Sequence, residues 1–254
     1  MKVGFSSDIG QKSSFEDTHV MLESFGGFRN KSFFAIYDGH RGKEASKIAS
    51  EVLHEVLLAE IKKDKDISDA LEKAFIDTDK QIEETGIESG TTAVVALFDG
   101  QNLIVANVGD SRAVLDRGRL GVKRLSHDHK ADDPDEIKRI ESLGGFVKPK
   151  TAFDVARVNG DIAIARALGD KYFGEFVSPR PYISETQLTK NDKRLILACD
   201  GVWDVISDEE AVDLIAEVKD SQRASEILKN EALRRGSTDN ISVMIIDFAS
   251  FFSG

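Results

Sequence analysis

Two strand-like runs of this 254-residue chain end in groups that can bind a metal or move a proton. "FFAIYDGHRG" passes from apolar residues into Asp38, Gly39 and His40, and "LILACDGVWD" passes into Asp200. An aspartate at a strand end usually serves as a turn or cap residue. A metal site is the alternative, because carboxylate oxygens are ligands for hard cations and imidazole titrates near neutral pH.

The third Asp-Gly dipeptide has a simpler interpretation. Asp99-Gly100 lies between two apolar runs in "VVALFDGQNLIVANV". Two strand patterns joined by Asp-Gly are a strong hairpin signal, since glycine accepts the positive φ of a tight turn. We therefore predict a structural role for this dipeptide.

Further carboxylates flank other apolar runs. These are Glu16 and Asp17 in "FEDTHV", Asp110 in "IVANVGDSRAVL" and Asp239 in "TDNISVMII". A plain hairpin would account for Asp110, and a turn or cap for Asp239. If the carboxylates converged they would suit Mg²⁺ or Mn²⁺ and not zinc. They would also require the cation, because two carboxylates about 4 Å apart repel by roughly 4 kcal/mol at an effective dielectric of about 20.

The elements that must position these groups are strands grouped between helices. Strand signals cover 33–37, 91–98, 102–108, 111–116, 195–199 and 241–248. Helix signals cover about 42–60, 67–84, 134–143, 207–218 and 222–234, with Pro134 in a first turn and Ser207 as an N-cap. The stretch 144–190 is glycine-dotted, and we expect much of it to be irregular. The pattern favours an α+β fold, and without repeats or linkers we expect one domain over residues 1–254.

Composition excludes several classes of protein. The chain is 41% hydrophobic and 31% charged, with a net charge of −11, so nucleic acid is not an expected partner. No apolar run approaches the roughly 20 residues of a membrane span. No secretory signal is visible, and the single cysteine, Cys199, fits a reducing compartment. We expect a monomer in the cytoplasm or nucleus.

Nine segments, in order, resemble the metal-dependent protein serine/threonine phosphatases, the protein phosphatase type 2C family. They are "FED" (15–17), "FFAIYDGHRG" (33–42), "SGTTAVVALF" (89–98), "ANVGDSRAVL" (106–115), "LSHDHKADDPDEIKRIESLGGFV" (125–147), "RVNGDIAIARALGD" (157–170), "VSPRPYI" (177–183), "LILACDGVWDV" (195–205) and "TDNISVMII" (238–246). One such segment would be a weak signal, but nine in family order are highly specific.

The resemblance implies a fold and a reaction. The fold is an α-β-β-α sandwich of two packed antiparallel sheets with helices on both outer faces, and a flap-like subdomain at about 131–168. The reaction is hydrolysis of phosphoserine and phosphothreonine in protein substrates, a signalling activity. A metal-activated water attacks phosphorus in line, and no phosphoenzyme forms. The cofactors are two Mg²⁺ or Mn²⁺ ions, with a third, weaker ion in many members.

The same resemblance assigns the site. Asp38 bridges the two metals at the catalytic centre, and His40 is the candidate general acid. The other metal-binding positions are Gly39 through its carbonyl, Asp200 and Asp239 directly, Glu16 and Asp17 mostly through water, and Asp110 with Asp204 at the third metal.

Two positions depart from the family pattern. Lys12 stands where an arginine usually grips the substrate phosphate, so we predict weaker phosphate binding, because lysine lacks the planar two-pronged donor. The alternative is that Lys12 is a solvated loop residue. Arg41 replaces a small residue and either contacts phosphate or points to water. Arg166 is expected to pair with a carboxylate.

An alternative function is a phosphatase-like binding or regulatory protein that has lost catalysis. Such a protein would be expected to lack one or more metal aspartates, whereas Asp38, Asp200 and Asp239 are all present. Only Lys12 favours this alternative. A phosphatase for small metabolites is also compatible with the same residues.

Overall fold

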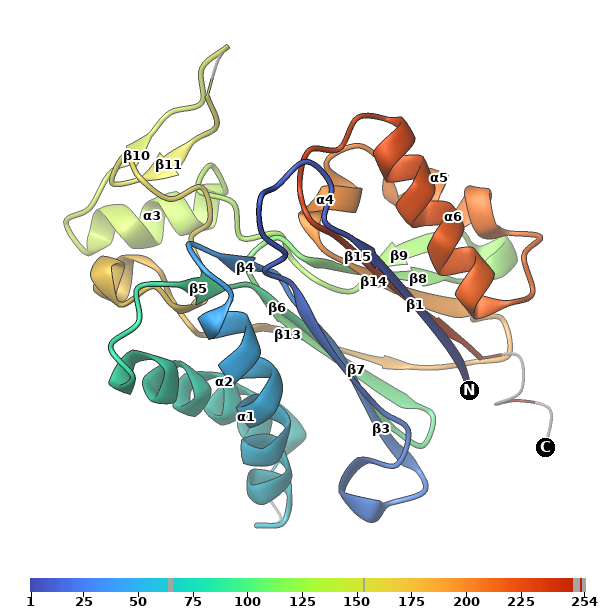
Figure 1. Ribbon diagram of the computed structural model, residues 1–254. Helices are drawn as coiled ribbons and strands as arrows, with labels where there is room; N and C mark the ends of the chain where they lie inside the picture. The colour runs from blue at the N-terminus through green and yellow to red at the C-terminus, as the bar shows by residue number, and fades with distance from the viewer. Residues whose placement is uncertain (64–65, 153, 249–251, 253–254) are drawn as a thin grey trace.

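Two five-stranded antiparallel sheets pack face to face in the computed structural model, which describes residues 1–63, 66–152, 154–248 and 252 (Figure 1). The first sheet has the order β1 (Lys2–Asp8), β15 (Ile241–Asp247), β14 (Arg194–Ala198), β8 (Arg112–Asp116), β9 (Val122–Arg124). The second has the order β13 (Tyr182–Gln187), β7 (Asn102–Val108), β6 (Ala93–Asp99), β3 (Lys31–Tyr37), β2 (Thr18–Leu22).

Helices cover both outer faces of this sandwich (Figure 1). Helices α1 (Glu44–Ile61) and α2 (Ile67–Glu84) pack on the second sheet. Helices α4 (Asp200–Trp203), α5 (Asp208–Ile215) and α6 (Ser221–Arg234) pack on the first. The predicted α-β-β-α sandwich is confirmed.

Smaller elements gather at one end of the sandwich. Helix α3 (Pro134–Ser142) and the pair β10 (Val147–Lys148) and β11 (Arg157–Val158) project beyond the sheets (Figure 1). A three-stranded sheet has the order β12 (Leu168–Gly169), β5 (Gly90–Thr91), β4 (Gly39–His40). Short 3-10 turns are η1 (Phe25–Gly27), η2 (Gly118–Leu120) and η3 (Lys171–Phe176).

The central strands are apolar on both faces because both faces are covered. In β3, Phe33 and Tyr37 pack in the cluster under α1 and α2, whereas Phe34 and Ile36 pack between the two sheets. Successive strand side chains point to opposite faces, so a strand between two packed layers reads as a continuous apolar run. This explains why the runs that end in the candidate ligands were visible in the sequence.

Helix starts follow the predicted capping chemistry. The side chain of Ser207 accepts from Glu210 N, and the Glu210 side chain accepts from Ser207 N, which forms a capping box. Pro134 lies in the first turn of α3, after Asp133 as N-cap. The Asp99-Gly100 hairpin is also confirmed, because β6 and β7 pair from Asp99 onward.

One turn was interpreted wrongly. The runs on either side of Asp110 are β7 and β8, which belong to different sheets. The turn is therefore a crossing between the two layers and not a hairpin. Edge strands β1, β2, β9 and β13 were not predicted, because their polar and apolar residues are mixed in strands that are only partly covered. Strand β13 falls in the stretch that was expected to be irregular.

Candidate metal and active site

A cavity of about 520 Å³ opens where the turns of both sheets meet. Eight of the ten residues predicted for the site line it, namely Lys12, Glu16, Asp38, Gly39, His40, Asp110, Asp200 and Asp239. They come from separate turns, which follow β3 and β14, cross from β7 to β8, and precede β2 and β15. The sandwich thus brings together carboxylates that lie far apart in the sequence.

Asp38 is held at the end of β3 by its backbone. Its N–H donates to Thr92 Oγ1 at 3.3 Å, and its carbonyl accepts from Thr92 N at 2.9 Å. The next residue must be glycine, because a Cβ on Gly39 would lie 2.5 Å from the carbonyl oxygen of Glu16. Thr92, between β5 and β6, also lines the cavity but was not predicted, since a threonine at the start of an apolar run carries no distinct signal.

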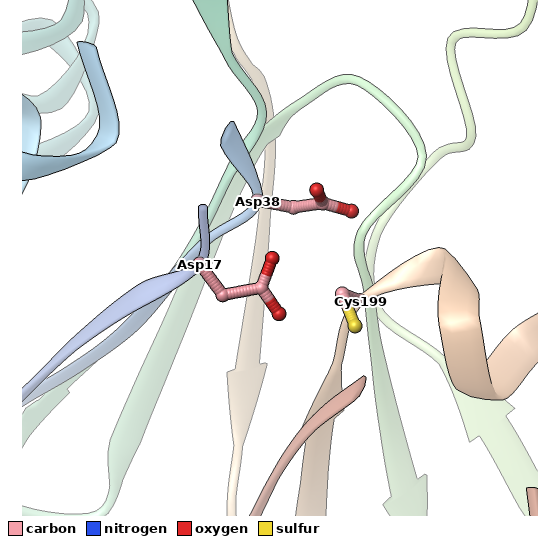
Figure 2. Close-up of side chains that lie close together, drawn as sticks. All are labelled: Asp17, Asp38 and Cys199. Atoms are coloured by element: carbon pink, nitrogen blue, oxygen red, sulfur yellow. The ribbon is translucent and has the colours of Figure 1, made fainter. Parts of the chain in front are cut away.

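Asp17 lies beside Asp38 but is not one of the residues that line the cavity. Its Oδ2 accepts from Ser242 Oγ at 2.6 Å, and its buried Oδ1 has no hydrogen-bond partner in the described part of the chain. Figure 2 shows the carboxylates of Asp17 and Asp38 extending toward Cys199, which lies on a third chain segment, and one potential ligand atom from each residue lies within 4.8 Å of the others.

Cys199 does not act as a thiolate in this arrangement. Burial raises the pKa of its thiol well above the usual value, and the carboxylates of Asp17 and Asp38 raise it further. The sulfur accepts from Ser242 N at 3.1 Å and donates to the Asn240 carbonyl at 3.3 Å. Cys199 is instead a small, buried residue of the core between the two sheets.

The loop between β1 and β2 is fastened to β15 by one amide. Asn240 Nδ2 donates to the carbonyls of Ile9 and Ser14 at 2.9 and 3.0 Å, and its Oδ1 accepts from Glu16 N at 2.8 Å. The loop therefore presents Glu16 and Lys12 to the cavity. Lys12 Nζ lies 2.8 Å from Asp239 Oδ1, so it is not a purely solvated lysine.

The last two predicted ligands meet through a lysine. Lys130 Nζ lies 3.0 Å from Asp204 Oδ1 and 3.8 Å from Asp110 Oδ2. Asp110 is buried and lines the cavity, whereas Asp204 is exposed and lies outside it.

Electrostatics make this cluster a good fit for divalent cations. Desolvation raises the pKa of Asp38 and Asp200 well above the usual value, and neighbouring carboxylates raise both further. Burial raises the pKa of Asp17 and of Asp110 to about 6. Asp200 Oδ1 is buried and, within the described residues, unpartnered. Like charges this close need a cation to stay ionised, and an all-oxygen donor set suits Mg²⁺ or Mn²⁺.

Arginines near the cavity pair with protein carboxylates. Arg41 Nη2 lies 3.0 Å from Asp161 Oδ1, and its guanidinium lies 4.8 Å from the ring centroid of Phe173. The interpretation that Arg41 simply points to water is therefore wrong. Arg166 pairs with the buried Glu136 at 2.6 Å, as expected. Asp161 was not predicted, because its approach to the cavity depends on the fold of the 144–170 stretch.

A cavity that combines clustered carboxylates, an imidazole and a lysine is the kind of site with which metal-dependent hydrolases act on phosphate esters. The comparisons identify the family. The family model described as Protein phosphatase 2C matches residues 1–241. The chain belongs to the protein phosphatase 2C family.

Curated relatives match over nearly the whole chain. Protein phosphatase 2C homolog 1 of Schizosaccharomyces pombe is 38% identical, over 96% of this chain and 72% of that protein. Protein phosphatase 2C homolog 1 of Saccharomyces cerevisiae is 36% identical, over 96% and 92%. The chain is thus a metal-dependent protein serine/threonine phosphatase, a hydrolase whose substrates are phosphoproteins.

Solved structures share the fold. A sex determining protein of C. elegans superposes with a TM-score of 0.87 at 27% identity, over 96% of this chain and 64% of that chain. Serine-threonine phosphatase 2C from Toxoplasma gondii has a TM-score of 0.85 at 23% identity, over 96% and 94%. Among the described residues, no helix combines the length and apolar character needed to cross a bilayer.

Proposed function

We propose that the cavity holds two Mg²⁺ or Mn²⁺ ions, to both of which Asp38 would be a ligand, and that the enzyme hydrolyses phosphoserine and phosphothreonine there. The observation that carries this assignment is the convergence of Asp17, Asp38 and Asp200. The two lysines near them, Lys12 and Lys130, form ion pairs with other carboxylates of the site. Neither lysine therefore forms an ion pair with Asp17, Asp38 or Asp200.

The remaining ligand positions are proposed from the family resemblance, and their support is that most of them line the cavity. In this proposal the Gly39 carbonyl completes one metal site, and Asp200 with Asp239 completes the other. Glu16 and Asp17 act mostly through water, and Asp110 with Asp204 provides a weaker third site. When bound, the cations neutralise these carboxylates and activate a water molecule for in-line attack on phosphorus.

Two side chains act on the substrate itself. Lys12, at the rim of the cavity, attracts the phosphate oxygens, and His40 donates a proton to the leaving serine or threonine oxygen. The protonated, hydrogen-bonded thiol of Cys199 does not serve as a nucleophile, which accords with a reaction without a phosphoenzyme.

The segment at about 131–168 supports a role as a flap. It contributes α3, β10 and β11, and its side chains form most of a separate small apolar cluster beside the cavity. We assign it to substrate choice within a single catalytic domain of residues 1–254. A monomeric state, a cytoplasmic or nuclear location and the absence of nucleic-acid partners stay predictions from the sequence.

Release of phosphate from a phosphothreonine peptide tests the assignment. With Mn²⁺ or Mg²⁺ the wild type is expected to turn over, and EDTA should abolish turnover. Asp38→Ala should lower kcat by more than about 100-fold, since loss of a partner even outside the ligand sphere costs up to that much. A folded wild type without metal-dependent turnover would support a phosphatase-like binding protein instead.

A further inference from the structure

A buried carboxylate next to His40 has no role in the site described above. Asp170 is 1% exposed, and its Oδ2 lies 2.7 Å from His40 Nε2. Its other oxygen, Oδ1, is buried without a hydrogen-bond partner in the described residues. The imidazole is thus the one side chain to which this carboxylate is bonded in that part of the chain.

The backbone at Asp170 is held in an uncommon conformation. Its φ of 53° and ψ of 34° lie in the left-handed region, which residues with a side chain adopt rarely. The residue stands at the start of η3, yet its side chain makes no capping hydrogen bond. The preceding Gly169 N–H donates to Asp79 Oδ1 of α2 at 2.7 Å, which anchors the turn. Capping therefore does not explain why an aspartate occupies this position.

The strand opposite His40 leaves room for this contact. His40 in β4 pairs with Gly90 in β5. A Cβ on Gly90 would lie 2.3 Å from Asp170 Oδ2 and 2.5 Å from His40 Nε2. Since real Cβ atoms do not approach so closely, the Asp170–His40 pair requires glycine at residue 90. The absence of a side chain at residue 90 thus serves this single contact.

We propose that Asp170 is a positioning residue for the general acid of the phosphatase. Its carboxylate accepts from Nε2–H and fixes the imidazole, so that Nδ1 carries the transferable proton. As the P–O bond breaks, that proton passes to the leaving serine or threonine oxygen. The neutral imidazole keeps its Nε2–H on Asp170. This inference rests on the role proposed for His40.

Substrates with different leaving groups separate positioning from structure. A phosphothreonine peptide releases an alkoxide that needs a proton, whereas p-nitrophenyl phosphate releases a stable phenolate. At saturating Mn²⁺, Asp170→Asn should lower kcat for the peptide by about 10- to 100-fold with little change in KM. The same variant should lower kcat for p-nitrophenyl phosphate by less than about threefold, because that step gains little from a general acid. In a His40→Ala background, Asp170→Asn should cause no further loss.

Matched variants make each outcome decisive. Asp192→Asn changes another buried aspartate, which pairs with Arg117 away from the cavity, and should leave both rates unchanged. Gly90→Ala separates the pair by steric contact and should reproduce the peptide-selective loss if Asp170→Asn fails to fold. Equal losses on both substrates, or losses additive with His40→Ala, would overturn the inference. A His40→Ala enzyme without a peptide-selective loss would overturn it together with the general-acid assignment. A wild type inactive with Mn²⁺ on either substrate would instead overturn the proposed function.

Discussion

Lys12 illustrates how one side chain sets the strength of substrate binding. Burial lowers its pKa, but the carboxylates of Asp239, Asp200 and Asp38 together outweigh this effect, so the pKa stands above its usual value and the ammonium stays charged. A lysine is a point charge on a flexible stem, and it must be shared between Asp239 and an incoming phosphate. An arginine would offer two parallel donors to the same pair of anions.

Lys12→Arg is therefore expected to strengthen substrate binding. KM for a phosphothreonine peptide should fall by about tenfold, the equivalent of one additional charge-assisted hydrogen bond, while kcat changes little. Steady-state kinetics at saturating Mn²⁺ measures both constants. Lys123→Arg, on edge strand β9, is the control and should behave as wild type. An unchanged KM for Lys12→Arg would show that residue 12 does not contact phosphate.

At the scale of elements, the site depends on where apolar strands stop. Strands β3 and β14 were predicted from their uninterrupted apolar runs, and with them the positions of Asp38 and Asp200 at strand ends. Their convergence was not visible, because it depends on pairing between strands distant in the sequence and on the crossing at Asp110. Asp170 and Asp161 were missed for a related reason, since the irregular 144–170 stretch has no periodicity that orients a side chain.

Helix α2 is linked to the turn at Gly169 by the buried carboxylate of Asp79. Burial raises the pKa of Asp79 to about 7, and the hydrogen bond from Gly169 N opposes the rise only in part. An unfolded aspartate titrates near pH 4, so the folded chain binds the extra proton between about pH 4 and 7. The contribution of protonated Asp79 to the free energy of unfolding is thus fully present below about pH 4 and is lost as the pH rises to about 7.

Asp79→Asn should flatten this part of the pH dependence, because the amide keeps the acceptor for Gly169 N but does not titrate. Between pH 5 and 7, the free energy of unfolding of the wild type should fall relative to the variant by about 1 kcal/mol per pH unit. Urea unfolding at pH 5, 6, 7 and 8 measures the difference. Asp77→Asn, which removes a partly exposed carboxylate of the same helix, should run parallel to the wild type. If the free energy of unfolding of Asp79→Asn ran parallel to that of the wild type over this pH range, the raised pKa of Asp79 would be contradicted.

At the scale of the whole molecule, carboxylates that repel one another are concentrated at one end of the sandwich. Its stability comes from apolar layers between and outside the sheets, while carboxylates from both sheets meet at the cavity. Composition predicted an acidic domain, and the ordered segments predicted the family and the fold. The repulsion among these carboxylates could not be predicted from the sequence, because it depends on short distances between residues that lie far apart along the chain.

The most direct test of the site is the melting temperature in EDTA and in increasing Mn²⁺. At Mn²⁺ about 100-fold above its dissociation constant, the wild type should melt about 5–10 °C higher than in EDTA, because the folded chain alone binds the ions. Asp38→Asn should melt higher than the wild type in EDTA, since one repelling charge is removed, and should lose most of the shift with Mn²⁺. Asp99→Asn, which alters the Asp-Gly dipeptide of the β6–β7 hairpin, should keep the full shift. Equal Mn²⁺ shifts in the wild type and Asp38→Asn would contradict a metal centre built on Asp38.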